Sequence, residues 1–121
     1  MKDKKPYIGI RYAWAGIYYV IKAERNFRIH LLVACLVIIT GIILQISRSD
    51  WLGVILVIGL VLVTETVNSA IERIIDYVKP DIHPAAKIIK DLAAGAVLIA
   101  AIISVAVGLI VFIPYFREVW R

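Results

Sequence analysis

The sequence predicts an all-α integral membrane protein, built as a single domain over residues 1–121 from one amphipathic surface helix and three transmembrane helices. Hydrophobic residues make up 62% of the 121 residues, whereas soluble globular domains contain about 45–50%. A chain of this length buries only about two-thirds of its unfolded surface, so a soluble monomer could not hide so much apolar side chain. Its single cysteine, Cys35, argues against a disulfide scaffold and is expected to be a buried thiol in an apolar run.

The first predicted element is a surface helix over about residues 7–25. At about 100° per residue, its basic residues share one side: Arg11, Lys22 and Arg25. Its apolar residues share the other: Ile10, Trp14, Ile17 and Ile21. A basic helix with aromatic residues on its apolar side is typical of the membrane interface. Glu24 falls on the apolar side of this helix, so we expect it to face the rest of the protein.

Three spans follow, over about residues 28–47, 51–76 and 85–113. The third is the clearest, because no charge interrupts it from Leu92 to Ile113 and a spanning helix needs about 20 mostly apolar residues. The break before the second span offers Ser49 or Asp50 as its N-cap. Two prolines separate the second span from the third.

The distribution of Lys and Arg predicts the orientation in the cell membrane. Residues 1–30 hold seven of them and residues 73–90 hold four, whereas the loop at Arg48 holds one and the C-terminal tail holds two. The positive-inside rule therefore places the N-terminus and the loop around Pro80 in the cytoplasm. With three spans, the C-terminus lies outside.

The second span carries a polar stripe that lipid cannot accommodate. Its members are spaced i, i+3, i+7 and i+11: Glu65, Asn68, Glu72 and Asp76. A charge at mid-membrane costs at least about 2.5–3.5 kcal/mol, so the stripe must face protein, water, a cation or a polar ligand. At about 1.5 Å per residue, Glu65 lies about 21 Å beyond Trp51, inside the cytoplasmic edge of a hydrocarbon core about 30 Å thick.

Carboxylates on two different helices, together with a lysine, suit a magnesium–nucleotide site. Glu24 and Glu72 supply the one or two carboxylates that Mg²⁺ takes beside phosphate oxygens. Lys90 suits the neutralisation of a transferring phosphoryl group. Glu65 lies deeper and suits a general base that removes a proton from an alcohol. The alternative interpretation is a structural polar network that ties the helices together.

Several other kinds of site have no counterpart in the sequence. There is no Gly-x-x-x-x-Gly-Lys-Ser/Thr loop and no glycine-rich kinase loop, which excludes the soluble nucleotide-binding folds that use them. The two histidines lack the spacing of metal ligands. His30 is expected to be an interfacial residue, and His83 either a solvated loop residue or a nucleotide contact.

The stripe resembles the signature of the small prokaryotic diacylglycerol kinase family of integral membrane proteins. Residues 65–76 match Glu-x-x-Asn-Ser/Thr-Ala-apolar-Glu-x-x-apolar-Asp at every position, and the similarity extends over about residues 5–113. It includes Trp14-Ala-Gly16, Glu24-Arg-Asn-Phe27-Arg28 and Lys90-Asp91-x-x-x-Gly95. The resemblance implies a homotrimer whose active sites are shared between subunits at the cytoplasmic membrane interface.

The resemblance also implies a role for each matched residue. Glu65 would be the catalytic base, and Glu24 and Glu72 would hold Mg²⁺ on the ATP phosphates. The other ATP-binding residues would be Tyr12, Asn68, Asp76, Asp81, His83, Lys90 and Asp91. The lipid substrate would lie near Trp14, Arg28, Glu65 and Ala94.

The family has one branch that phosphorylates diacylglycerol and one that phosphorylates undecaprenol. Residues 24–30 and 108–114 resemble the undecaprenol branch, and Ala94 stands where the other branch usually has a serine. We therefore expect Mg²⁺-dependent transfer of the ATP γ-phosphate to undecaprenol, with a weak side activity on diacylglycerol; the alternative is a diacylglycerol kinase that makes phosphatidic acid. The expected partners are ATP, membrane lipids and two further copies of the chain, and no nucleic acid.

Two interpretations from other classes remain. A small proton-coupled transporter would use a membrane glutamate, but it would be expected to place the acid near mid-membrane. A non-catalytic interaction protein would use the same acids only for helix assembly.

Overall fold

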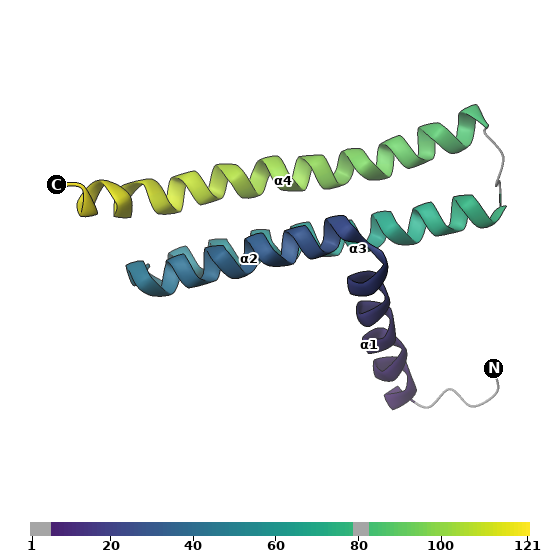
Figure 1. Ribbon diagram of the computed structural model, residues 1–121, viewed down its shortest axis with the longest axis horizontal. Coiled ribbons are helices and arrows are strands. Elements are labelled where there is room, and N and C mark those ends of the chain that lie inside the picture. The colour runs from purple at the N-terminus through teal and green to yellow at the C-terminus, as the bar shows by residue number, and fades with distance from the viewer. Residues whose placement is uncertain (1–5, 79–82) are drawn as a thin grey trace.

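The computed structural model describes residues 6–78 and 83–121, and it confirms the predicted all-α fold of the chain (Figure 1). In this part of the chain there is no strand, and four helices account for the secondary structure. They are α1 (Pro6–Ala23), α2 (Arg25–Leu44), α3 (Arg48–Val78) and α4 (Pro84–Val119). α2, α3 and α4 are each long and apolar enough to cross a membrane.

The three long helices run side by side, and α1 leaves them at a wide angle (Figure 1). α3 and α4 are antiparallel and make the most extensive contact, while α2 packs against α3. The apolar side of α1 is open, since Trp14 is 66% exposed and Ile10 63% exposed. With the bundle across the membrane, α1 therefore lies along its surface and turns apolar side chains toward lipid.

The junction between α1 and α2 corrects one expectation from the sequence. Glu24 was expected on the surface helix, but it lies outside both helices, in extended backbone with φ −108° and ψ 112°. The chain has to turn here from the membrane surface into the bundle, and a residue at such a turn leaves helical dihedrals. Arg28 supports the turn, because its Nη1 donates to the carbonyls of Ile21 at 2.9 Å and Lys22 at 2.8 Å, near the end of α1.

The start of α3 corrects a second expectation. Neither Ser49 nor Asp50 is the N-cap; instead the Ser47 hydroxyl accepts the backbone N–H of Asp50 at 3.2 Å. A serine cap serves the N–H three residues ahead, so the helix begins one residue after Ser47, at Arg48. On α4, Tyr115 donates its hydroxyl to Asp50 Oδ2 at 2.7 Å and accepts the Ser47 N–H at 3.0 Å. These contacts join α3 to α4 at the end far from α1.

The inward side of α2 explains a third correction. Phe27, Ala34 and Gly41 are buried at seven-residue intervals, which marks the stripe of α2 that faces the bundle. Cys35 comes directly after Ala34, so it is rotated by about 100° from that stripe and is exposed. The prediction of a buried thiol was wrong, because an apolar run in a membrane helix does not separate the protein side from the lipid side.

Candidate active site

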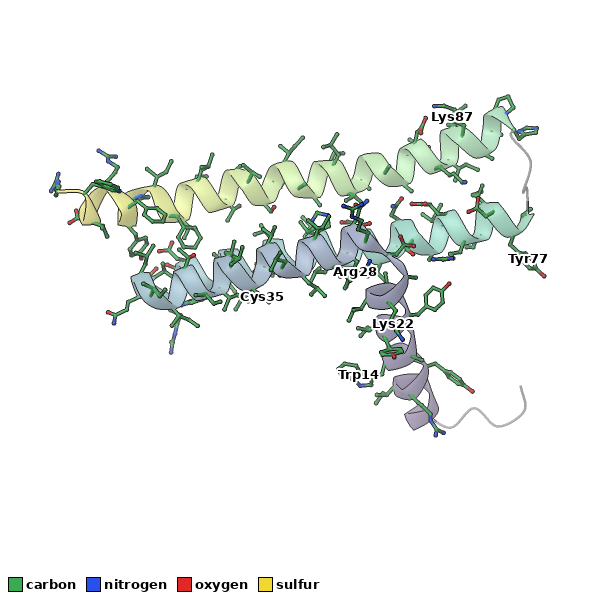
Figure 2. The ribbon with its side chains drawn as sticks, viewed as in Figure 1. Trp14, Lys22, Arg28, Cys35, Tyr77 and Lys87 are labelled. Carbon is green, nitrogen blue, oxygen red and sulfur yellow. The ribbon has the colours of Figure 1, made fainter. Side chains whose placement is uncertain are left out.

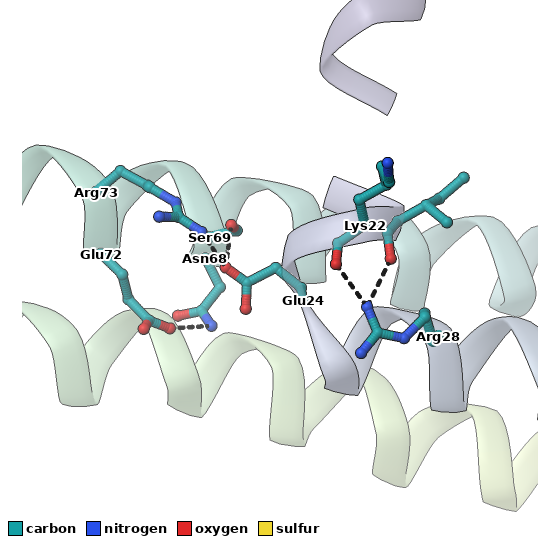
Figure 3. Close-up of polar contacts among 8 residues, drawn as sticks. Lys22, Glu24, Arg28, Asn68, Ser69, Glu72 and Arg73 are labelled. Carbon is teal, nitrogen blue, oxygen red and sulfur yellow. Dashed lines mark hydrogen bonds and ion pairs between the residues drawn. The ribbon is translucent and has the colours of Figure 1, made fainter. Parts of the chain in front are cut away.

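Glu24, the residue between α1 and α2, is called the hinge below. Its carboxylate lies against the middle of the α3 polar stripe (Figure 3). Ser69 donates its hydroxyl to Glu24 Oε1 at 2.8 Å, and Arg73 Nη2 lies 3.1 Å from the same oxygen. Ser69 and Arg73 are four residues apart on α3, so both face the hinge. The turn between α1 and α2 therefore places the Glu24 carboxylate beside α3, the helix that also carries Glu65 and Glu72.

Glu72 lies on the same part of α3 and is held by its own helix. Asn68 Nδ2 donates to Glu72 Oε1 at 2.9 Å, one helical turn away. Within the described residues, the buried Asn68 Oδ1 has no hydrogen-bond partner. A buried acceptor of this kind costs free energy until a donor reaches it, so the site can still accept a hydrogen bond.

Glu65 forms the deepest part of the site. It is only 3% exposed, and His30 Nε2 on α2 lies 3.8 Å from its Oε2. Sequence reasoning treated His30 as an ordinary interfacial residue. The signal was present, because His30 comes three residues after Phe27 and four before Ala34 on the inward stripe of α2.

Ion pairs line the end of the bundle beyond the hinge. Lys90 Nζ on α4 lies 2.5 Å from Asp76 Oδ1 on α3, and Lys87 Nζ lies 2.6 Å from Asp91 Oδ2 within α4. Lys90 therefore joins α4 to the last member of the polar stripe. His83 caps α4, since its Nδ1 accepts the backbone N–H of Ala85 at 3.1 Å.

The remaining predicted residues are more scattered in a single chain. Trp14 lies on α1 away from the bundle, whereas Arg28 lies where α1 meets it (Figure 2). Tyr12 is exposed on α1 and Ala94 is exposed on α4. Asp81, expected near the nucleotide, lies outside the described residues.

Arg73 contacts the site although the sequence did not identify it as a candidate. Besides its ion pair with Glu24, its guanidinium lies 5.0 Å from the centre of the Tyr19 ring on α1. Arg73 thus connects α1, the hinge and α3. The sequence position of Arg73, one turn after Ser69, does not reveal its ion pair with Glu24. The distance between these two side chains depends on how the chain turns between α1 and α2.

The donor set fits Mg²⁺ in one arrangement. Among the described residues, no three His, Cys, Asp or Glu side chains are placed to hold a metal ion together. Glu72 on α3 and Glu24, which contacts α3 through Ser69, nevertheless offer hard oxygen donors on the same part of the bundle. Mg²⁺ commonly takes one or two protein carboxylates and completes its shell with phosphate oxygens and water. The pair fits a metal that is shared with a nucleotide, and not a cage made by protein alone.

Comparison with known proteins gives matches over most of the chain. The sequence profile of a family described as "Prokaryotic diacylglycerol kinase" matches residues 11–112. The "Undecaprenol kinase" of Bacillus subtilis is 41% identical over 103 residues, covering 85% of this chain and 84% of the relative. A "Diacylglycerol kinase" of Synechocystis is also 41% identical, over 88% of this chain but 62% of the relative. The "Diacylglycerol kinase" of Escherichia coli is 29% identical over 87% of this chain and 86% of the relative.

Proposed function

This chain belongs to the prokaryotic diacylglycerol kinase family, and from this premise we propose that it transfers the γ-phosphate of ATP to undecaprenol, giving undecaprenyl phosphate. The observation that carries the proposal is the meeting of the Glu24 hinge with the α3 stripe that holds Glu65 and Glu72. The choice of acceptor is supported by the Bacillus subtilis relative, which is similar along most of both chains. Ala94 adds support, because it offers no hydroxyl to a glyceride head group.

Glu65 is the general base in this proposal. It lies at the deep end of the site, where an alcohol coming sideways from the bilayer meets a nucleotide coming from the cytosol. Glu65 accepts the hydroxyl proton as the alcohol oxygen bonds to the γ-phosphorus in line with the departing ADP. Both substrates reach one site, so no covalent enzyme intermediate is needed.

Glu24 and Glu72 would hold Mg²⁺ beside the ATP phosphates, and the bound metal would offset the negative charge of the triphosphate. Lys90, paired with Asp76 across α3 and α4, keeps an ammonium at the end of the cluster where the triphosphate arrives. The nucleotide is further positioned by Tyr12, Asn68, Asp81, His83 and Asp91.

The protein acts as a homotrimer in the cell membrane, with its N-terminus in the cytoplasm and its C-terminus outside. The open apolar side of α1 supports a position along the cytoplasmic surface, with Trp14 and Arg28 near the lipid substrate. Small residues on α4 allow close helix packing: Ala93, Ala94, Gly95, Ala96 and Ala100. Of these, Ala93 and Ala100 are already buried within the chain, whereas Ala94 and Ala96 are exposed and leave room for another helix. A single chain leaves most of its apolar surface uncovered, and further copies would cover part of it.

The test is a phosphotransfer assay with the purified protein in detergent, using Mg-ATP with undecaprenol or diacylglycerol as acceptor. Undecaprenol is expected to be the better acceptor, and a preference for diacylglycerol would establish the alternative activity. Glu65→Gln is expected to lose activity by about 10²–10⁴-fold while the protein still inserts. The neighbouring Thr66→Val is the control, because the Thr66 hydroxyl is bonded to the Leu62 carbonyl of its own helix. Near-normal activity of Glu65→Gln would refute its role as base.

The same preparation separates the rival classes. A proton-coupled transporter would carry protons across liposomes without consuming ATP, whereas a kinase consumes Mg-ATP only when an acceptor alcohol is added. A non-catalytic interaction protein would do neither. Loss of Mg-ATP binding in Glu24→Ala would argue against the interaction protein.

A further inference from the structure

A cavity of about 270 Å³ lies between α2, α3 and α4, directly beneath the proposed active site. Because α2 and α3 are antiparallel, its residues His30 and Val61 lie at the end nearer Glu65, while Val37 and Val54 lie at the far end. The cavity therefore runs from the polar cluster toward the membrane interior. At about 270 Å³ it is slightly smaller than a typical small-molecule site of about 300–1,000 Å³, so it holds only a part of a long chain.

The cavity wall is apolar apart from two residues, His30 and Ser104. The Ser104 hydroxyl donates to the Ala101 carbonyl of its own helix at 3.1 Å. His30 is thus the polar group that this wall offers to a ligand. A ligand with one polar end and a hydrocarbon chain fits, whereas ester carbonyls beside the polar end would be buried without donors.

The distance between the His30 and Glu65 side chains indicates which chemical group forms the polar end of the ligand. Nε2 and Oε2 are 3.8 Å apart, too far for a direct hydrogen bond. A hydroxyl oxygen at about 2.8 Å from each atom would bridge them, accepting from the His30 N–H and donating to the Glu65 carboxylate. An alcohol can do both at once, as can water, and the apolar cavity beside this position favours the alcohol because it can receive the attached hydrocarbon chain.

We propose that His30 is a further catalytic residue that binds the acceptor hydroxyl beside Glu65, and that the cavity receives the hydrocarbon chain next to it. This rests on the proposed lipid kinase function. In the transfer step, the hydroxyl proton goes to Glu65 and an oxygen lone pair forms the bond to the γ-phosphorus. The bond from phosphorus to the bridging oxygen breaks, and ADP leaves with that electron pair. His30 keeps its proton and orients the attacking lone pair.

The first experiment compares steady-state kinetics of His30→Ala and His30→Gln with wild type, varying undecaprenol and Mg-ATP separately. His30→Ala is expected to lose at least about tenfold in kcat/KM for the alcohol, with the KM for Mg-ATP unchanged. His30→Gln retains an N–H donor and is expected to recover part of the loss. Cys35→Ser, on the exposed side of the same helix, is the control for damage to α2.

Two outcomes would overturn the role of His30: wild-type kinetics in His30→Ala, or a loss shared equally by both substrates and not recovered by glutamine. Either result leaves the proposed function standing, because the wild-type enzyme is active in both cases. A wild-type protein that phosphorylates no lipid alcohol refutes the proposed function instead.

The second experiment narrows the cavity. Val105 lines it and is 61% exposed, while Ile102 is 60% exposed on the same helix and lies outside the cavity wall. Val105→Phe is expected to raise the KM for undecaprenol severalfold and to affect a short-chain prenol less, whereas Ile102→Phe changes neither. Equal effects of the two variants, or a change in oligomer mass without a change in the KM for undecaprenol, would overturn the assignment of the cavity to the acceptor chain.

Discussion

At the hinge, the Glu24 carboxylate takes a hydrogen bond from Ser69 and an ion pair from Arg73 on the same oxygen, Oε1. The Arg73 side chain is half exposed, and exposed ion pairs contribute only about 0–1 kcal/mol to stability. Arg73 is also packed over the Tyr19 ring, which restricts its rotamers. Its main effect is therefore on the direction of the Glu24 carboxylate, and not on the folding free energy.

This predicts a selective defect in Arg73→Ala. Under the proposed mechanism, the variant is expected to need severalfold more Mg²⁺ for half-maximal activity, because Glu24 would no longer be held toward the metal, while its thermal midpoint changes little. The measurement is a magnesium titration of kinase activity at fixed ATP, beside a thermal melt. Arg117→Ala, an exposed arginine near the end of α4, serves as the control, and an unchanged magnesium requirement in Arg73→Ala would contradict the role.

Glu72 gives a second prediction at this scale. Glu72→Gln keeps a carbonyl oxygen that can still accept from Asn68 Nδ2, so the helix contact survives while the charge is lost. Turnover is expected to fall nearly to background, because an amide is a poor ligand for Mg²⁺ beside the triphosphate. The assay is initial rate in detergent after equal insertion into membranes. Substantial turnover at millimolar Mg²⁺ would count against Glu72 as a metal ligand.

The candidate site could be predicted only in part from the sequence. Glu65 and Glu72 were identifiable because charge inside a span is costly wherever the span lies. His30 and Arg73 were not identified, because each depends on a distance between helices that no periodicity encodes. Glu24 faces the rest of the protein as expected, but it lies between α1 and α2 and not on the surface helix, since the angular argument assumed that this helix continued through Glu24.

At the scale of elements, the turn between α2 and α3 depends on a close approach. A Cβ added at Gly41 would lie 2.8 Å from the Trp51 ring and 3.2 Å from the Ile46 side chain. Ile46 and Trp51 also pack with Val54 and Val111 at the end of the bundle far from α1. The glycine therefore lets α2 lie against the first turn of α3.

Gly41→Ala is accordingly expected to destabilise the protein by about 1–3 kcal/mol, the usual cost of overpacking. Gly59→Ala is the matched control, because a Cβ there meets nothing within 4 Å and alanine favours a helix by about 1 kcal/mol over glycine. Thermal melts in one detergent compare the two variants. A Gly41→Ala protein as stable as Gly59→Ala would show that the Trp51 ring can move aside freely.

The helices themselves followed from apolar run length, and their ends were harder to predict. α2 starts at Arg25 and α3 continues to Val78, both beyond the expected spans. The length of an apolar run shows only where the apolar residues end. A helix can continue beyond that point into water when ion pairs such as Lys90–Asp76 support it. The Ser47 cap was missed because the hydroxyl that serves a helix start depends on local backbone geometry.

For the whole molecule, the point at which α1 leaves the bundle indicates where the membrane surface is expected to lie along the long helices. α2 leaves this level with 20 residues, about 30 Å of helix, which matches the hydrocarbon core. α3 and α4 extend past the hinge in the other direction (Figure 1), so in the proposed orientation Asp76, Lys87 and Lys90 lie outside the membrane on the cytoplasmic side. Glu24 and the acids of the α3 polar stripe then lie where the hydrocarbon core ends, and only ATP from that side can reach them.

The orientation can therefore be tested with cysteines at opposite ends of the bundle. In a Cys35→Ser background, Tyr77→Cys marks the end near the active site and Val119→Cys marks the other end; both positions are exposed. A thiol reagent that does not cross membranes is expected to label Val119→Cys in intact cells, and Tyr77→Cys only after permeabilisation. The reverse pattern would place the cluster outside, where cytosolic ATP cannot reach it, and would contradict both the orientation and the kinase mechanism built on it.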